Sequence, residues 1–174
     1  KTIQSKCLIG ADGQYSLVRT QNQIDLKTKT YGHQALIGTV NVQSHTYPAF
    51  ERFLKKGAIA FLPLKDQRAV FIWTVPEDEA QQLFQKEEAE FLNILQDCFG
   101  YRLGKLSNLQ GKKVFPLTMT QADVQGKAYQ SLLLMGTSAL SLHPIGAQGL
   151  NLSLRNIGLL AKLLNEQKDC TLCF

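Results

Sequence analysis

Two strand–turn–helix patterns lie far apart in the chain, and they constrain its fold more than any other feature. The first begins at residues 5–10, which predict a strand, and continues through a turn at 11–13 into a short helix over 14–20. Asp12 or Gly13 is expected near the N-cap of that helix, because such residues favour this position. Turns at the carboxyl ends of parallel strands are where α/β proteins bind nucleotides, so functional residues are expected here.

The second pattern lies near the other end of the chain. Residues 130–135 predict a fully buried strand, which runs into a loop over 136–148 and then into a helix over 149–165. Gly146 and Gly149 permit close backbone approach or positive φ values. The helix directs free N–H groups and the positive end of its dipole back toward the loop. This loop is therefore expected to hold an anionic or electron-rich group.

The residues between these patterns predict a mainly antiparallel sheet. Period-two alternation indicates a strand at 32–43 and two more at 58–63 and 68–75, which form a hairpin. A further strand pair is expected at 103–109 and 112–121.

A single helical insert is expected within this sheet. Apolar residues at helical spacing predict a helix over 77–99, which starts after Pro76 and closes at Gly100. The fold class is therefore α+β or α/β, with an antiparallel sheet flanked by two strand–loop–helix units. The expected division is 1–20, 21–122 and 123–174.

Composition excludes several classes of protein. Of the 174 residues, 44% are hydrophobic, and the longest apolar stretches fall far short of the ~18 residues that span a bilayer. The net charge is +5, but the basic residues are scattered, which argues against nucleic-acid binding. Four cysteines are too few for a disulfide scaffold, and no metal site is expected. A cytoplasmic setting fits best, and the chain, which starts at Lys1, is expected to be part of something longer.

The two patterns carry specific motifs. Asp12-Gly13 opens a motif that ends at Arg19, and residues 142–152 run from Leu142-His143-Pro144 to Gln148-Gly149-Leu150-Asn151-Leu152. Three further phrases are Ala49-Phe50-Glu51-Arg52-Phe53, Gly57 through Leu64, and Trp73-Thr74. Together they resemble the class A flavoprotein aromatic monooxygenases, the para-hydroxybenzoate hydroxylase-like group, and within it the ubiquinone-biosynthesis hydroxylases.

The resemblance implies that the two outer parts belong to a Rossmann-like FAD-binding domain. The GxGxxG unit for the ADP half of FAD is absent from this sequence and is expected upstream. Because that unit is absent here, we expect that this chain alone neither retains FAD nor turns over substrate. The cofactor-binding residues it assigns are Asp12, Gly13, Arg19, Gly136, Thr137, Pro144, Gly146, Ala147, Gln148, Gly149, Leu150 and Asn151.

The chemistry that the resemblance implies belongs to the cofactor. NAD(P)H reduces FAD, O₂ adds at C4a, and the resulting hydroperoxide passes a hydroxyl group to a phenol. No protein nucleophile is expected, and the sequence contains no Ser-His-Asp or paired-carboxylate constellation. The substrate implied is a polyprenylated phenol of ubiquinone biosynthesis, and the expected lining residues are Leu62, Pro63, Leu64 and Trp73. A lipid-tailed substrate implies peripheral contact with the inner membrane or with partners in a biosynthetic complex.

Some positions depart from the family pattern and leave two alternatives open. Thr137 stands where many members have aspartate, Ser153 replaces a customary glycine, and Asn156 replaces a customary aspartate. A threonine hydroxyl can still hydrogen-bond, but charge assistance is lost. One alternative is a non-catalytic scaffold of a ubiquinone-biosynthesis complex. The other is a monooxygenase of a soluble aromatic compound.

Overall fold

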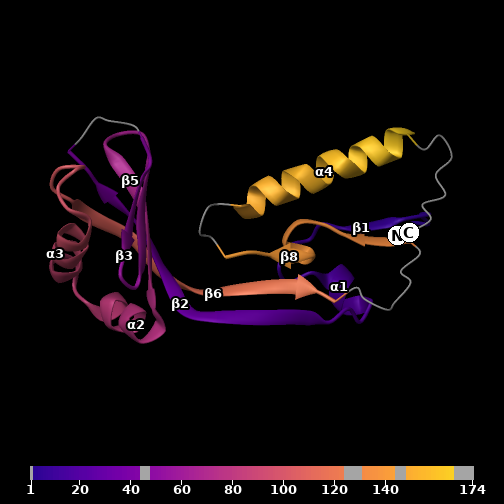
Figure 1. The fold of residues 1–174 in the computed structure, drawn as a ribbon, viewed down its shortest axis with the longest axis horizontal. Helices are drawn as coiled ribbons and strands as arrows, with labels where there is room; N and C mark the ends of the chain where they lie inside the picture. Colours follow the sequence, from indigo (N-terminus) through magenta and orange to yellow (C-terminus); the bar gives the residue numbers. More distant parts are fainter. Residues whose placement is uncertain (1, 44–47, 124–130, 144–147, 167–174) are drawn as a thin grey trace. The chain divides into compact units, whose positions relative to one another are not determined.

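The computed structural model describes residues 2–43, 48–123, 131–143 and 148–166. These residues form two compact units. Unit 1 comprises Lys1–Thr30 and Thr118–Phe174, and unit 2 comprises Tyr31–Leu117. The strands β2 (Leu26–Asn41) and β6 (Ser107–Ala122) each begin in one unit and end in the other (Figure 1).

Unit 2 is built on antiparallel strands. They belong to a six-stranded sheet with the order β3-β4-β5-β2-β6-β8, whose last strand, β8, belongs to unit 1. The strands not yet given are β3 (Phe50–Leu54), β4 (Gly57–Pro63), β5 (Arg68–Pro76) and β8 (Leu140–Ser141). The β4–β5 hairpin confirms the sequence prediction, and Asp66 and Gln67 adopt positive φ at its turn.

One face of this sheet forms the core of unit 2. The register places Leu36 and Ile59 beside Trp73, so these side chains lie on the same face. Helices α2 (Glu77–Gln85) and α3 (Glu88–Phe99) cover that face (Figure 1). Phe91 of α3 packs against Trp73 with ring centroids 6.0 Å apart. Tilted aromatic pairs of this kind add to the stability gained by burying their apolar area.

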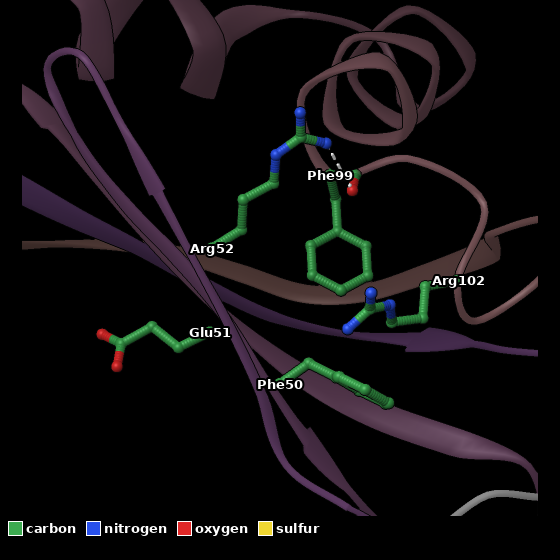
Figure 2. A pocket seen from close by; sticks show the side chains of 5 residues that line it. All are labelled: Phe50, Glu51, Arg52, Phe99 and Arg102. Carbon is green, nitrogen blue, oxygen red and sulfur yellow. Dashed lines mark hydrogen bonds between the residues drawn. The ribbon is translucent and has the colours of Figure 1, made fainter.

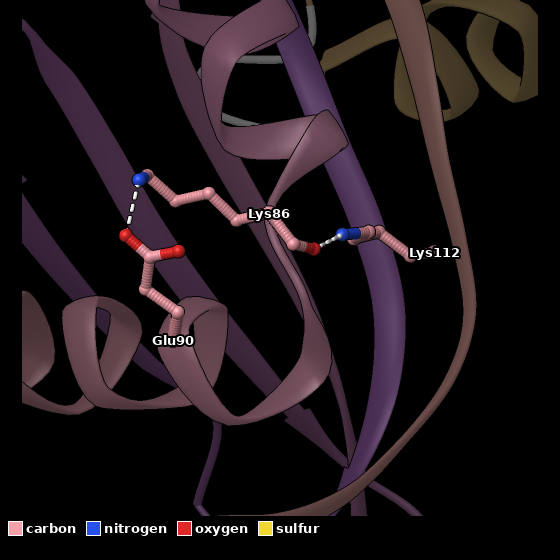
Figure 3. Close-up of polar contacts among 3 residues, drawn as sticks. All are labelled: Lys86, Glu90 and Lys112. Carbon is pink, nitrogen blue, oxygen red and sulfur yellow. Dashed lines mark hydrogen bonds and ion pairs between the residues drawn. The ribbon is translucent and has the colours of Figure 1, made fainter.

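The helix predicted over 77–99 is wrong in one respect. Its start after Pro76 and its end at Gly100 are as expected, but the chain is extended at Lys86 and Glu87 and two helices result. The carbonyl oxygen of Lys86 accepts a hydrogen bond from Lys112 Nζ at 2.8 Å (Figure 3). The sequence contains no glycine or proline at this break, so no local signal predicts it. A contact with the distant strand β6 supports the break instead.

The strand pair predicted at 103–109 and 112–121 is also wrong. Residues 107–122 form the single strand β6, in which positive φ at Asn108 and Gly111 is accommodated without a chain reversal. The preceding residues are a loop held by buried Gln96, which donates to Gly100 O at 2.8 Å and accepts from Leu106 N at 2.8 Å.

Cations from strands lie at the carboxyl ends of both helices of unit 2. Neither helix has a basic residue in its own last turn. Lys112 Nζ binds the carbonyl that follows α2 and lies 4.8 Å from the centroid of the Phe91 ring, and Lys86 pairs with Glu90 (Figure 3). Burial lowers the pKa of Lys112, and the nearby Glu87 partly opposes that shift.

At the carboxyl end of α3, Arg52 donates to Phe99 O at 2.7 Å. Such cations stabilise the negative end of a helix dipole.

Unit 1 contains a parallel strand pair. Strand β1 (Leu8–Gly10) pairs with β7 (Leu132–Leu134), followed respectively by α1 (Leu17–Gln21) and by the 3₁₀ turn η1 (Gly136–Ser138). Helix α4 (Gln148–Glu166) closes the described part of the chain. Of the predicted strand 130–135, residue 130 lies outside the described residues, and β7 covers 132–134 and is half-buried rather than fully buried.

Replacing Gly57 with alanine should destabilise unit 2 strongly. Its φ is +147°, and an added Cβ would lie 1.9 Å from the backbone oxygen of Thr74. We expect Gly57→Ala to lower the free energy of unfolding by about 3 kcal/mol, measured in urea by the fluorescence of Trp73. Gly111→Ala is the matched control, because its φ is also positive but its Cβ would meet nothing within 4 Å. A loss no greater than that of the control would contradict this account.

Candidate functional site

The first motif forms a tight turn before α1. Ser16 is the N-cap, and its hydroxyl accepts the N–H of Arg19 at 2.9 Å. The sequence places Asp12 or Gly13 near this N-cap, and the structure gives the cap itself to Ser16. Asp12 instead accepts the N–H of Val18 at 3.1 Å, while its side chain stays exposed. Hydrogen bonds from Ser16 and from Val18 lower the pKa of Asp12, so an ionised carboxylate stands at this turn.

Arg19 joins the two motifs. The side chain is only 6% exposed, and it donates to Ser138 O at 2.9 Å and to Gln14 O at 2.7 Å. The bond to Ser138 connects residues that are 119 positions apart in the chain. Arg19 was predicted as a cofactor-binding residue, and the structure places it as a buried link between the two loops.

Ser138 is a site residue that the sequence did not reveal. It is fully buried, and its hydroxyl lies 2.5 Å from Gly10 O and 2.6 Å from Met135 O. The N–H of Met135 donates to Gly10 O at 2.9 Å. An added Cβ at Gly10 would lie 2.7 Å from Leu134 Cδ2 and 2.9 Å from Val18 Cγ1, so a side chain there would displace both of these side chains. The sequence feature that could have indicated this role for Ser138 is the Gly-Thr-Ser turn that follows the second predicted strand.

The second motif contributes an exposed turn and a helix start. Gly136 has φ +63°, and Thr137 beside it is exposed. Gln148, Gly149, Leu150 and Asn151 form the first turn of α4, and all four are exposed. Pro144, Gly146 and Ala147 lie outside the described residues.

A family model of the FAD binding domain matches residues 1–169. The chain belongs to this FAD-binding family. The family predicted from the two motifs is therefore confirmed.

Curated relatives of this FAD-binding chain include ubiquinone hydroxylases. It is 32% identical to ubiquinone hydroxylase UbiL of Rhodospirillum rubrum, over 94% of this chain and 38% of that protein. It is 28% identical to the human mitochondrial ubiquinone biosynthesis monooxygenase COQ6, over 94% of this chain and 42% of that protein. An uncharacterized Synechocystis protein is 35% identical, over 94% of this chain and 39% of its own length. The chain thus spans about two fifths of these relatives.

Solved structures share the fold. PqsL of Pseudomonas aeruginosa, a probable FAD-dependent monooxygenase, aligns with a TM-score of 0.69 at 23% identity over 92% of this chain and 46% of its own. Aklavinone-11 hydroxylase, solved with FAD and aklavinone, aligns with a TM-score of 0.66 at 18% identity over 91% of this chain and 30% of its own. The mixed architecture with a mainly antiparallel sheet is therefore that of flavin monooxygenases.

The residues at the second motif fit part of FAD. Reduction places negative charge on flavin N1 and on the C2 carbonyl, and the first-turn amides of a helix are suited to such charge. Gly149 is exposed, and an added Cβ there would meet nothing within 4 Å, so the described residues do not block a ligand from approaching this helix start. Ser153 Oγ donates to Gly149 O at 3.0 Å, which satisfies the serine within the helix.

The four predicted substrate-lining residues do not lie together. Leu62, Pro63 and Leu64 are exposed at the end of β4. Trp73 is only 2% exposed and packs in the core. Because the register aligns Ile59 with Trp73, Leu62, three residues further along β4, lies on the opposite face of the sheet.

Removing the Arg19 guanidinium should loosen the junction between the motifs. We expect Arg19→Met to lower the stability of unit 1 by about 3 kcal/mol, because two carbonyl groups lose a charged donor. Hydrogen–deuterium exchange of β1 and β7 should then accelerate. Arg155→Met, on the exposed surface of α4, is the matched control and should leave this exchange unchanged. Equal exchange in both variants would contradict a linking role for Arg19.

Proposed function

We propose that this chain is part of an FAD-dependent monooxygenase that hydroxylates a polyprenylated phenol, using NAD(P)H and O₂. The observation that carries the proposal is the junction at Arg19, where the guanidinium bonds the turn of the first motif and the loop of the second motif. A buried link of this kind fixes the two loops that the family uses for one cofactor. The relatedness to ubiquinone hydroxylases supports the substrate class.

The chain's residues hold and orient the cofactor in this proposal. FAD, when bound and reduced, supplies the oxygen-activating chemistry. The N–H groups of Gly149, Leu150 and Asn151 stabilise negative charge at the pyrimidine edge of the ring. The ionised carboxylate of Asp12 stays exposed at its turn, available to the ribityl or nucleotide part.

The face of the unit 2 sheet opposite to α2 and α3 suits an apolar substrate tail. On the face opposite to α2 and α3, the register aligns Ile37, Ile72 and Ala60, and next to them Leu62 with Val70. Leu62 is 41% exposed and the other four are partly accessible. A prenyl chain gains free energy by covering such a surface. Peripheral contact with a membrane, or with partners in a biosynthetic complex, would deliver this kind of substrate. Among the described residues, no helix is sufficiently long and apolar to cross a membrane.

A non-catalytic scaffold is the second candidate. Thr137 is exposed at the turn where many family members carry a charged group, and this favours weaker retention of FAD. A monooxygenase acting on a soluble aromatic compound is distinguished by its substrates, because it would turn over simple phenols without preferring prenylated ones.

The visible absorbance spectrum of the full-length protein tests the proposal. We expect the purified full-length protein to show bound oxidised flavin that NAD(P)H bleaches without oxygen. The 174-residue chain alone should not retain FAD stoichiometrically. A colourless full-length protein that takes up no added FAD would establish the scaffold candidate instead.

A side chain at Gly149 should weaken FAD binding without unfolding the protein. An added Cβ there would meet no protein atom within 4 Å, so any loss of affinity would arise from the cofactor. We expect Gly149→Val in the full-length protein to bind FAD at least about tenfold more weakly, measured by flavin fluorescence quenching. Gly158→Val, in the same helix and equally open, is the control. Equal affinities in the two variants would contradict a flavin position at the start of α4.

A further inference from the structure

Unit 2 contains a cavity that neither flavin motif explains. Its volume is about 280 Å³, and it is lined by Phe50, Glu51, Arg52, Phe99 and Arg102 (Figure 2). Phe99 is buried and contacts Phe61 of the core, with ring centroids 4.4 Å apart. The cavity therefore has an aromatic wall that packs against the core. None of its lining residues belongs to the flavin motifs or to the predicted substrate-lining set.

Two guanidinium groups line this cavity without a carboxylate partner. Arg102 lies over the ring of Phe50, 5.4 Å from its centroid, and Arg52 donates to Phe99 O at 2.7 Å. Neither arginine forms an ion pair within the described part of the chain. Glu51 contributes to the lining, but Figure 2 shows its side chain directed away from both guanidinium groups.

The charge of the cavity is consequently positive, beside low-dielectric aromatic walls. Such an arrangement concentrates the electrostatic field and favours an anion. Arg52 uses one Nη atom on Phe99 O, and a guanidinium has five N–H donors, so others are available for a ligand. Each arginine presents a planar fork that matches a carboxylate.

The cavity lies on the opposite side of the sheet from the proposed substrate surface. Phe50 aligns with Phe61, and Arg52 aligns with Ile59, so both point to the face covered by the helices. Leu62, on the neighbouring strand, points to the other face. The aromatic and guanidinium side chains at Phe50 and Arg52 are therefore on the opposite face from the proposed prenyl surface, whereas Glu51 aligns with Ala60 and points to that other face.

We propose that this cavity binds a small aromatic carboxylate. The two arginines hold the carboxylate, and the rings of Phe50 and Phe99 pack against the aromatic ring of the ligand. The volume lies just below the roughly 300–1,000 Å³ typical of ligand pockets, which limits the ligand to about one ring. The proposal does not depend on flavin binding, because the cavity shares no residue with either flavin motif.

Calorimetric titration of the full-length protein with benzoate tests this site. We expect saturable binding of benzoate that weakens at least about tenfold in Arg102→Gln. Arg102 is exposed in a loop, so its replacement should not unfold the protein. Arg68→Gln is the matched control, because Arg68 is a partly exposed arginine of unit 2 outside the cavity, and it should bind benzoate as the unchanged protein does.

Two further probes test whether the cavity requires both an anionic group and an aromatic ring: benzyl alcohol, which is neutral, and inorganic phosphate, which has no ring. Benzyl alcohol should bind far more weakly than benzoate, because it lacks the anion, and inorganic phosphate should bind far more weakly, because it lacks the ring. Absence of benzoate binding, an unchanged affinity in Arg102→Gln, or phosphate binding as tight as benzoate would each overturn the proposal. The flavin spectrum of Arg102→Gln should equal that of the unchanged protein, so failure here is distinguishable from failure of the monooxygenase proposal.

Discussion

The buried guanidinium of Arg19 is the contact on which the proposed cofactor site depends. It bonds carbonyl groups of two loops that are far apart in the chain, Gln14 in the first motif and Ser138 in the second. Ser138 in turn places its hydroxyl against Gly10 O, at the end of the first strand. A buried charge of this kind is stable only when its donors are satisfied, so the two loops are held in one arrangement. The exposed turns around them are then free to meet a cofactor.

In unit 2, strands supply the positive charges at the carboxyl ends of the helices, because neither helix has a basic residue in its own last turn. Lys112 of β6 and Arg52 of β3 reach the carboxyl ends of α2 and α3. These contacts stabilise the carboxyl ends of the two helices and tie them to the strands of the sheet. Arg52 also lines the cavity beside Phe99. One residue thus contributes both to the packing of a helix and to the proposed carboxylate site.

Strand alternation divides the unit 2 sheet into surfaces with separate roles. The face under the helices holds Trp73 and the aromatic core, and the other face holds Leu62 and its apolar neighbours. Side chains one residue apart on β4 therefore belong to different environments. This explains why Trp73 and Leu62, although both near the same hairpin, cannot line the same side of the sheet.

Local sequence patterns determined the elements whose signals are contained in neighbouring residues. The β4–β5 hairpin, the helix start after Pro76 and the end of α3 at Gly100 follow from turn, capping and periodicity rules that act over a few residues. The motifs around Asp12 and Gly149 were sufficient to predict the FAD-binding family, because the family reuses the same short loops.

Tertiary structure alone decided the features that depend on distant partners. The break at Lys86 depends on a lysine of β6, and the continuity of β6 past Gly111 depends on its pairing within the sheet. Ser138 became a site residue only because the parallel pairing of β1 with β7 brings Gly10 against it. The physical reason is common to all three: sequence patterns encode local backbone preference, whereas register and burial choose which distant groups must satisfy one another.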